Sequence, residues 1–565
     1  MIDKRLRRTI KNRIPAWVAL FAILLAGAVT VSCQKSASAL RPKLLLFVVI
    51  DQLRADAVAL HKDKFGPNGF RYLMDNGLWY VNARHRHATT LTSVGHAVLF
   101  TGADAARHGI PANDWFDSVT GDHVYCLEDP SSKILGHENG VHEGASPRNL
   151  TSTTIADEVV RASGGTSRAF GVSLKDRGAI LAAGRLGKAF WYWAPTGEFV
   201  TSSFYYPAYP DWVSRWNADR PAARLAGRSW DLLMDRSMYL AGQADDRPAE
   251  KPPFDLGRTF PHPLPKDAAG PLFDVLDTTP FGDELTLDFV LTLLEAEKVG
   301  RGPSPDVLGI SFTATDYIGH AFGPDSLEYE DQVRRVDGLL ARLFTAVDKA
   351  VGLSNTIIVL TADHGVDLIP EVRQAERFPA GRFHMAEVQA RLSDALRKKF
   401  KTTEDLVRGF YNPCFFLATD KIRKLGLSQA AVEEAASEVL RTEPGVAYAV
   451  TRSTLIAGAV PDIPVMHMLQ ASFHPERSGH VFLIQRQGWF LLNEPTHYAA
   501  MHGSAYEYDI HVPLFVAGPG IRAGVVGRSV SPQDLAVTLA SYLGIAAPTG
   551  STGVPLAEVF ESGKR

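Results

Sequence analysis

The sequence predicts an α/β fold built on one large sheet. Apolar runs that are typical of buried strands alternate with helix-forming segments from Leu44 to the C-terminus. Three of these runs end in Asp or in an Asp/His pair, and the functional side chains of open α/β sheets gather at the carboxyl ends of strands. The chain has 565 residues, which is enough for one large α/β domain with insertions in its loops.

The elements follow one another in the order expected for such a fold. Short apolar runs predict strands at 44–50, 169–172, 307–312, 356–360 and 512–516. Valine and leucine at helical spacing predict a core-facing helix at 328–348, and a helix at 153–162 stops at Gly164. A last helix is expected after Ser531, a suitable N-cap, because Pro532 fits the first helical position.

Two long stretches interrupt this rhythm, at about 190–273 and about 368–489. The first is rich in Trp, Tyr and Pro. We expect both to form subdomains that cap the carboxyl edge of the sheet. For the aromatic residues of the first stretch, packing is favoured over a role as a substrate platform.

The composition restricts the classes of function. Hydrophobic residues make up 45% of the chain and charged residues 21%, which are values of a globular protein. The net charge is −3, so no basic field favours nucleic acid as a partner. Cys126 and Cys414 are the cysteines beyond the leader, and they either pair in an oxidising compartment or remain as buried thiols.

Residues 1–33 have the pattern of a secretory signal, so the catalytic domain is expected over 40–565. Six Lys and Arg residues precede an apolar segment at 16–31, which is shorter than the roughly 20 residues of a membrane-spanning helix. The segment ends in Thr-Val-Ser-Cys, similar to a bacterial lipobox. The protein is therefore expected to be periplasmic or secreted, either anchored by a lipid on Cys33 or cleaved near 36–39.

Acidic and histidine residues at three strand ends predict a metal site. Asp51 follows the first strand, Asp316 and His320 follow the run at 307–312, and Asp363 and His364 follow the strand at 356–360. Mixed Asp and His ligands are typical of zinc. Their combination favours a site for two zinc-type cations over scattered surface charge.

A cluster of hydroxyl residues precedes a short apolar helix that ends near Gly102. Thr92 lies at the start of this helix, where free backbone N–H groups and the positive end of the dipole suit a phosphate. The same pattern describes an ordinary N-cap, and by itself it does not distinguish the two.

The motifs, taken in order, resemble those of the alkaline phosphatase superfamily. Thr92 begins Thr-x-x-Gly-His-Ala, and further matches lie at 101–102, 108–115, 173–177, 210–213, 316–320, 363–365 and 502–504. Within the superfamily the chain looks like the PafA-type phosphatases with a threonine nucleophile, relatives of the type I phosphodiesterases and nucleotide pyrophosphatases. The resemblance covers essentially all of the mature chain. It implies a three-layer α/β/α sandwich with inserted cap subdomains.

The resemblance also implies roles for residues at matching positions. Asp316, His320 and His502 would hold one zinc ion. Asp51, Asp363 and His364 would hold the other, with the Thr92 oxygen as a further ligand. The residues that would bind the phosphoryl oxygens are Asn113, Lys175 and Arg177. Lys175 and Arg177 are two residues apart, so an extended backbone would point both to one face.

Several histidines and departures from the pattern bear on this interpretation. His497 is the main competitor of His502 as a ligand, and His96 is expected to shape the nucleophile helix. His85, His87 and His511 are not expected to be ligands. The Cys-x-Pro-x-Arg motif of typical sulfatases is missing. Related phosphodiesterases usually lack the Lys-x-Arg pair, so its presence favours monoesters.

We therefore expect a two-zinc phosphatase that acts on small phosphomonoesters through a phosphothreonine intermediate, without nucleic acid and as a monomer. The first alternative is a phosphodiesterase or nucleotide pyrophosphatase of the same superfamily. The second is a phosphate-binding lipoprotein without catalysis. The second is disfavoured because binding alone does not need a nucleophile such as Thr92.

Overall fold

The computed structural model describes residues 42–137, 144–241, 245–492 and 497–561. The predicted signal sequence and Cys33 lie outside the described residues. Within the described part of the chain, no helix combines the length and apolar character that crossing a bilayer requires.

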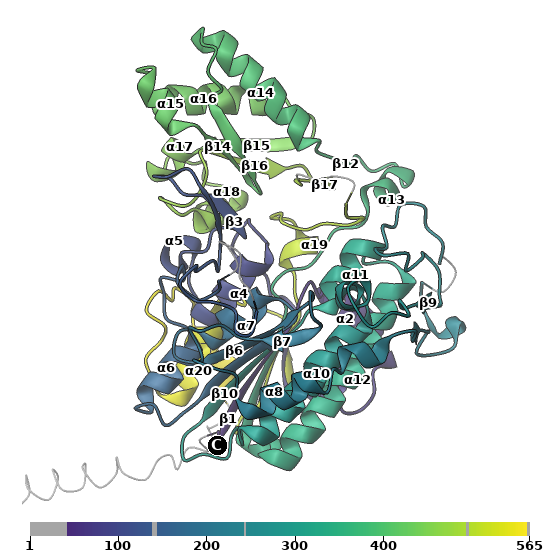
Figure 1. Ribbon diagram of the computed structural model, residues 1–565. Coiled ribbons are helices and arrows are strands. Elements are labelled where there is room, and N and C mark those ends of the chain that lie inside the picture. Colours follow the sequence, from purple (N-terminus) through teal and green to yellow (C-terminus); the bar gives the residue numbers. More distant parts are fainter. Residues whose placement is uncertain (1–41, 138–143, 242–244, 493–496, 562–565) are drawn as a thin grey trace, which may run out of the picture. The chain divides into compact units, whose positions relative to one another are not determined.

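A nine-stranded sheet forms the centre of the fold (Figure 1). Its order is β19 (Gly524–Val526), β2 (Gly77–Tyr80), β18 (Leu514–Ala517), β11 (Thr356–Thr361), β1 (Leu44–Ile50), β10 (Asp306–Phe312), β5 (Ala169–Ser173), β6 (Lys188–Trp193) and β7 (Glu198–Val200). The five strands from β11 to β6 are parallel, whereas β18 runs antiparallel to β11 and β7 antiparallel to β6. Because all parallel strands end at the same edge, side chains that follow them can meet there.

Helices cover both faces of the sheet, which confirms the predicted three-layer α/β/α sandwich. Every residue of β1 is buried, as expected for a central parallel strand. Its alternate side chains belong to different cores. Leu46 and Val48 pack with α10 (Pro280–Ala296) and α12 (Leu327–Ala350). Phe47 and Val49 pack with α4 (Thr92–Thr101), α6 (Ile155–Ala162) and α20 (Asp534–Leu543) on the other side (Figure 1).

Side-chain capping sets the start of several helices. Thr154 caps α6 in a reciprocal capping box with Asp157, and Ser326 caps α12. The last helix begins at Asp534, later than predicted. The Asp534 carboxylate accepts the N–H of Ser531 at 3.0 Å, and this interaction folds residues 531–533 into a separate turn.

The first predicted insertion starts within the sheet, because residues 188–193 and 198–200 are strands β6 and β7. The aromatic residues that follow are packed. Trp212 and Trp216 of α8 (Asp211–Ala218) lie 5.1 and 5.2 Å from the ring of Phe289.

The second predicted insertion contains a separate four-stranded antiparallel sheet. Its order is β13 (Val407–Tyr411), β14 (Cys414–Leu417), β16 (Val481–Gln485) and β15 (Val446–Thr451). Helices α14 (Met385–Phe400) and α16 (Gln429–Leu440) share an apolar core with it. We call residues 385–485 the cap. Cys414 of the cap and Cys126 are buried free thiols, so the structure does not pair them.

Candidate active site

The carboxyl edge of the sheet brings the predicted ligands together. Asp51 directly follows β1, and Asp363 lies two residues beyond β11. After β10 the chain enters α11 (Ala314–Phe322), which carries Asp316 and His320 one turn apart. Because β1 lies between β10 and β11 in the sheet, the three segments converge.

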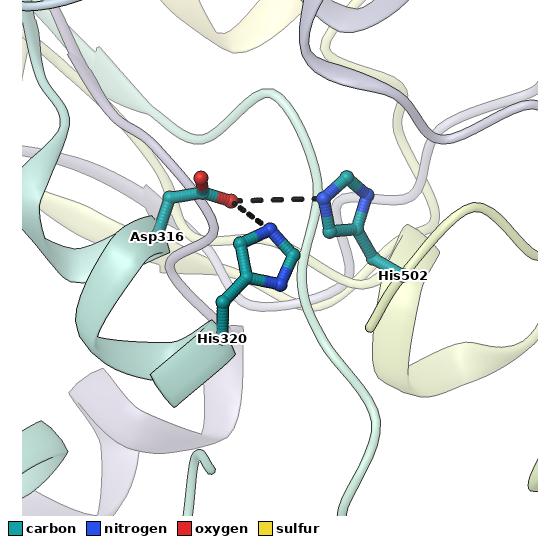
Figure 2. Close-up of side chains that lie close together, drawn as sticks. All are labelled: Asp316, His320 and His502. Atoms are coloured by element: carbon teal, nitrogen blue, oxygen red, sulfur yellow. Dashed lines mark ion pairs between the residues drawn. The ribbon is translucent and has the colours of Figure 1, made fainter. Parts of the chain in front are cut away.

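One group of ligands consists of Asp316, His320 and His502 (Figure 2). Asp316 Oδ1 lies 3.3 Å from His320 Nε2 and 3.6 Å from His502 Nε2. All three residues are buried. Their ligand atoms lie within 4.8 Å of one another, a spacing that one cation can bridge.

A second group centres on His364 Nε2. This atom lies 3.5 Å from Asp51 Oδ1, 3.3 Å from Asp363 Oδ2 and 3.3 Å from Thr92 Oγ1. Asp316 also lies within 4.8 Å of Asp51 and His364, so its carboxylate reaches toward both groups. The rings of His364 and His502 stack with centroids 3.6 Å apart. The two groups are therefore adjacent parts of one site.

Backbone contacts fix the tautomer of each histidine ligand. Nδ1 faces a carbonyl oxygen in every case: His320 faces Ala500 at 2.8 Å, His502 faces Thr90 at 2.6 Å and His364 faces Gly365 at 3.0 Å. A carbonyl oxygen only accepts, so Nδ1 carries the proton. Nε2 then presents its lone pair to the carboxylates, which is the arrangement of metal-binding histidines.

The charges at the site favour cations. Asp51, Asp316 and Asp363 are almost completely buried, and the ammonium of Lys175 is the cation that contacts two of them. Burial, with repulsion from Asp316 and Asp363, raises the pKa of Asp51. Burial also lowers the pKa of His364, which favours the neutral imidazole. The negative charge thus exceeds the positive charge in a largely buried region, and such a region is stabilised by bound cations.

Lys175 lies between the two groups of ligands. Its Nζ is 2.9 Å from Asp51 Oδ2 and 2.5 Å from Asp316 Oδ2. Burial opposes the charged form, but attraction by these two carboxylates outweighs it and raises the pKa of Lys175. The predicted extended Lys-x-Arg backbone is wrong. Lys175 is the N-cap of α7 (Asp176–Ala183), and Arg177 lies within the first turn of that helix.

Arg177 is held by Tyr125, a residue that sequence reasoning missed. The Tyr125 hydroxyl accepts from Arg177 Nη1 at 2.5 Å and donates to Asp176 Oδ1 at 2.7 Å. Burial raises the pKa of Tyr125, so the phenol stays protonated and serves both contacts. Tyr125 lies on β4 (His123–Tyr125), outside every motif, and no local signal marks it.

Thr92 is the first residue of α4, as the sequence predicted for the nucleophile helix. Asn113 Oδ1 accepts the N–H of Ser93 at 3.2 Å, so Asn113 also caps this helix. His96 lies one turn further on. Its Nδ1 is 2.9 Å from the Thr92 carbonyl and 3.2 Å from Asp363 Oδ2, so it links the helix to a predicted ligand.

A cavity of about 330 Å³ opens onto the site. Thr92, Asn113, Lys175 and Arg177 line it together with Asp316, His320 and His502. Its other walls include Tyr317, Tyr498 and three residues from the edge of the cap, Phe410, Tyr411 and Asn412. The cap thus contributes directly to the cavity, and no motif in the sequence marks which of its residues do so.

The other histidines lie elsewhere. His497, the predicted competitor of His502, packs its ring against Tyr498 at 4.5 Å and lines a neighbouring cavity. His85 Nε2 lies 3.1 Å from the carbonyl of Ala362, and burial lowers the pKa of His85 to about 4. His511 Nε2 lies 2.9 Å from the carbonyl of Val81.

Comparisons with known proteins show the family of this chain. The family model of type I phosphodiesterase/nucleotide pyrophosphatase matches residues 45–505. Alkaline phosphatase PhoV of Synechococcus elongatus is 34% identical over 92% of this chain and 93% of its own length. Alkaline phosphatase PafA of Elizabethkingia meningoseptica is 32% identical over 95% of this chain and 98% of its own length.

Solved structures show the same fold. The crystal structure of wild-type alkaline phosphatase PafA superimposes with a TM-score of 0.84 at 32% identity, over 92% of this chain and 99% of that one. A murine ectonucleotide pyrophosphatase/phosphodiesterase 5 has a TM-score of 0.51 at 16% identity, over 90% and 96%. This second likeness shows the fold alone.

Proposed function

Because the chain belongs to the type I phosphodiesterase/nucleotide pyrophosphatase family, we propose that its cavity hydrolyses phosphate monoesters through a phosphothreonine intermediate on Thr92. One observation carries this proposal. A hydroxyl nucleophile, the ligands Asp316, His320 and His502, and the cations Lys175 and Arg177 line one cavity, and the second group of ligands is adjacent to the first. The full-length similarity to proteins named alkaline phosphatases supports the choice of monoesters.

The residues present fit two zinc ions. Asp51 Oδ1 and Asp363 Oδ2 are buried and have no hydrogen-bond partner among the described residues. The histidines direct Nε2 lone pairs at the same region, and this mixture of carboxylate oxygens and imidazole nitrogens is the donor set of zinc. Asp316, His320 and His502 would hold one ion, and Asp51, Asp363 and His364 the other. Bound there, zinc would lower the pKa of a nearby hydroxyl and stabilise the charge on a leaving oxygen.

The chain's own residues position the substrate. Thr92 opens α4, so a phosphoryl group bound beside it would lie at the positive end of the helix dipole. Asn113 caps that helix while it lines the cavity. The guanidinium of Arg177 forks onto two oxygens, and the ammonium of Lys175 adds a compact charge.

The reaction has two displacement steps. Thr92 Oγ1 attacks phosphorus and loses its proton, while the bond from phosphorus to the leaving oxygen breaks and the alcohol departs with a proton. Water then attacks the phosphothreonine, and inorganic phosphate leaves as Thr92 recovers its hydroxyl proton. Phe410 and Tyr411 line the same cavity and offer an apolar leaving group a surface to pack against.

A double variant tests the choice between monoesters and diesters. Lys175→Ala/Arg177→Ala removes two charges from the non-bridging oxygens, and each charge-assisted contact contributes roughly 1.5–3 kcal/mol. Monoester kcat/KM should fall about a hundredfold or more, since each 1.4 kcal/mol is tenfold. Diester turnover should change far less. Lys349→Ala, which removes an exposed lysine at the end of α12, is the control.

Two results would move the assignment to a phosphodiesterase. One is equal losses of the double variant on both substrates. The other is a wild-type enzyme that prefers the diester.

We also propose that the protein is exported, on the strength of the basic and apolar pattern of residues 1–33. Mass spectrometry of the mature N-terminus distinguishes a lipid-modified Cys33 from simple cleavage near 36–39. Recovery of the protein in the cytoplasm with Met1 intact would contradict export.

A further inference from the structure

Gln52 follows Asp51 at the end of β1 and belongs to neither group of predicted ligands. Its side chain is fully buried. Its φ is 66°, in the left-handed region that residues with a Cβ rarely occupy. Such a conformation persists where the surroundings hold it, and it is often found at functional sites.

Gln52 contacts one carboxylate from each group of ligands. Its backbone N–H donates to Asp363 Oδ1 at 3.2 Å, and its side-chain amide donates through Nε2 to Asp316 Oδ1 at 2.7 Å. Asp363 follows β11 and Asp316 follows β10, on opposite sides of β1. The left-handed turn at the end of β1 thus directs the backbone N–H of Gln52 to Asp363 after β11 and its side-chain amide to Asp316 after β10.

Two further contacts hold Gln52 in place. Tyr329 of α12 donates its hydroxyl to the Gln52 carbonyl at 3.0 Å. On the other side, the amide packs against Gly319 of α11. A Cβ at Gly319 would lie 1.9 Å from Gln52 Oε1, so the space that the amide needs exists because residue 319 is glycine. Gly319 directly precedes the ligand His320.

The hydrogen bonds treat the two carboxylates differently: Asp363 keeps one oxygen without a partner, whereas both oxygens of Asp316 accept a hydrogen bond, Oδ1 from Gln52 and Oδ2 from Lys175. Asp363 Oδ1 accepts the N–H groups of Gln52 and His364, while Asp363 Oδ2 has no hydrogen-bond partner among the described residues. Asp316 Oδ1 accepts the Gln52 amide on one side and faces His320 Nε2 on the other. These bonds orient each carboxylate, and such contacts behind the ligands set both metal affinity and geometry.

We infer that Gln52 is a positioning residue that couples the two groups of ligands, so that loss of its amide weakens cation binding at the Asp316 group. The inference rests on the two-zinc site proposed above. Its backbone N–H acts on Asp363 and its side chain acts on Asp316, so substitutions separate the two effects.

The test compares zinc affinity, measured by competition with a chelator, in four proteins. Gln52→Met keeps the length of the side chain and removes the donor. Gln52→Glu replaces the donor with a charge that repels Asp316. The control is Gln533→Met, because Gln533 is also buried and its amide donates to a carboxylate, Asp104, that is not a predicted ligand. We expect zinc affinity to fall about 10–100-fold in Gln52→Met, further in Gln52→Glu, and to stay unchanged in Gln533→Met.

A second readout separates positioning from folding. At limiting zinc the turnover of Gln52→Met should be low and should recover when zinc is in excess, which a general loss of structure would not allow. If Gln52→Met fails to fold, Gln52→Gly carries the same test, because glycine favours the left-handed backbone and also lacks the amide.

The outcomes are distinct. A wild-type protein that binds no zinc would overturn the two-zinc site and this inference with it. A wild-type protein with two zinc ions, together with Gln52→Met of unchanged zinc affinity, would overturn this inference and leave the proposed function standing.

Discussion

Tyr125→Phe removes one oxygen atom and tests whether the position of Arg177 governs activity on monoesters. The hydroxyl accepts from Arg177 and donates to Asp176, and it reaches no substrate-binding group other than Arg177. Phenylalanine preserves the ring over which the guanidinium lies, 5.7 Å from its centroid. The variant therefore changes how Arg177 is held without changing the shape of the cavity.

The size of the effect follows from the contacts that remain. A hydrogen bond to a charged group contributes roughly 1.5–3 kcal/mol. Arg177 keeps an ion pair with Asp176, with 3.5 Å between Nη1 and Oδ1, so we expect a loss near the lower limit. About 1.5 kcal/mol corresponds to a roughly tenfold fall in monoester kcat/KM. A diester has no third non-bridging oxygen for Arg177 to hold, so its kcat/KM should change by less than about threefold.

The assay is steady-state hydrolysis of an aryl phosphate monoester and the matching diester at saturating zinc. Tyr411→Phe is the control, because it removes a hydroxyl from the cap side of the same cavity and leaves Arg177 untouched. Unchanged monoester kcat/KM in Tyr125→Phe would refute the role given to Arg177. Equal losses on the two esters would show that Tyr125 supports the fold of the site and not monoester binding.

Three further predictions follow from the site and its surroundings. Thr92→Ala should abolish phosphoryl transfer and leave zinc content and melting temperature unchanged. Thr92→Ser keeps the hydroxyl oxygen and should therefore keep part of the activity. Near-normal turnover of Thr92→Ala would exclude the covalent intermediate. Elemental analysis of dialysed, active protein should find about two zinc ions per chain. Both zinc content and activity should fall in acid, because the imidazole ligands must be neutral to bind zinc. Activity without any zinc-like metal would contradict the proposed metal site. Glu250 is 4% exposed, and neither of its carboxylate oxygens has a hydrogen-bond partner among the described residues. Burial, together with repulsion from the carboxylate of Glu328, raises the pKa of Glu250 from 4.5 to about 9. The folded state therefore binds the proton of the Glu250 carboxyl group more tightly than the unfolded state does. The stability that this protonation contributes is complete below about pH 4.5 and is lost as the pH rises through 9. Glu250→Gln should raise the melting temperature at pH 9 and have little effect at pH 5, and an equal change at both pH values would contradict the raised pKa.

The strands that the sequence predicted well are those buried on both faces. The run at 44–50 is continuous and apolar because helices cover both sides of β1, and its bounds agree with the structure. The strand predicted at 512–516 starts two residues too early, because β18 covers Leu514–Ala517 in the structure. This strand also runs antiparallel to β11. Strand direction depends on pairing between distant segments, and the local pattern of a four-residue strand carries no information about it.

The candidate ligands were found because each follows a strand or a recognisable motif. The structure brings Asp51, Asp363 and His364 together, and it places Asp316 close to both groups. Gln52 and Tyr125 were missed for a physical reason. Their roles depend on where the chain turns and on which side chains face them, and neither property leaves a periodic or spaced signal in the sequence.

The distance in sequence between the ligands has a consequence for how the enzyme matures. Asp51 and His502 are about 450 positions apart, and His502 is held by the carbonyl of Thr90, directly ahead of the nucleophile helix. No fragment that lacks the last hundred residues can offer a complete set of ligands. A chain emerging from the ribosome, or threading through a translocon, would therefore complete the proposed set of ligands only after His502 has docked against Thr90. If zinc binds as proposed, its uptake is a late step of folding, and a pulse-labelled chain should acquire resistance to chelators and to proteases at the same time.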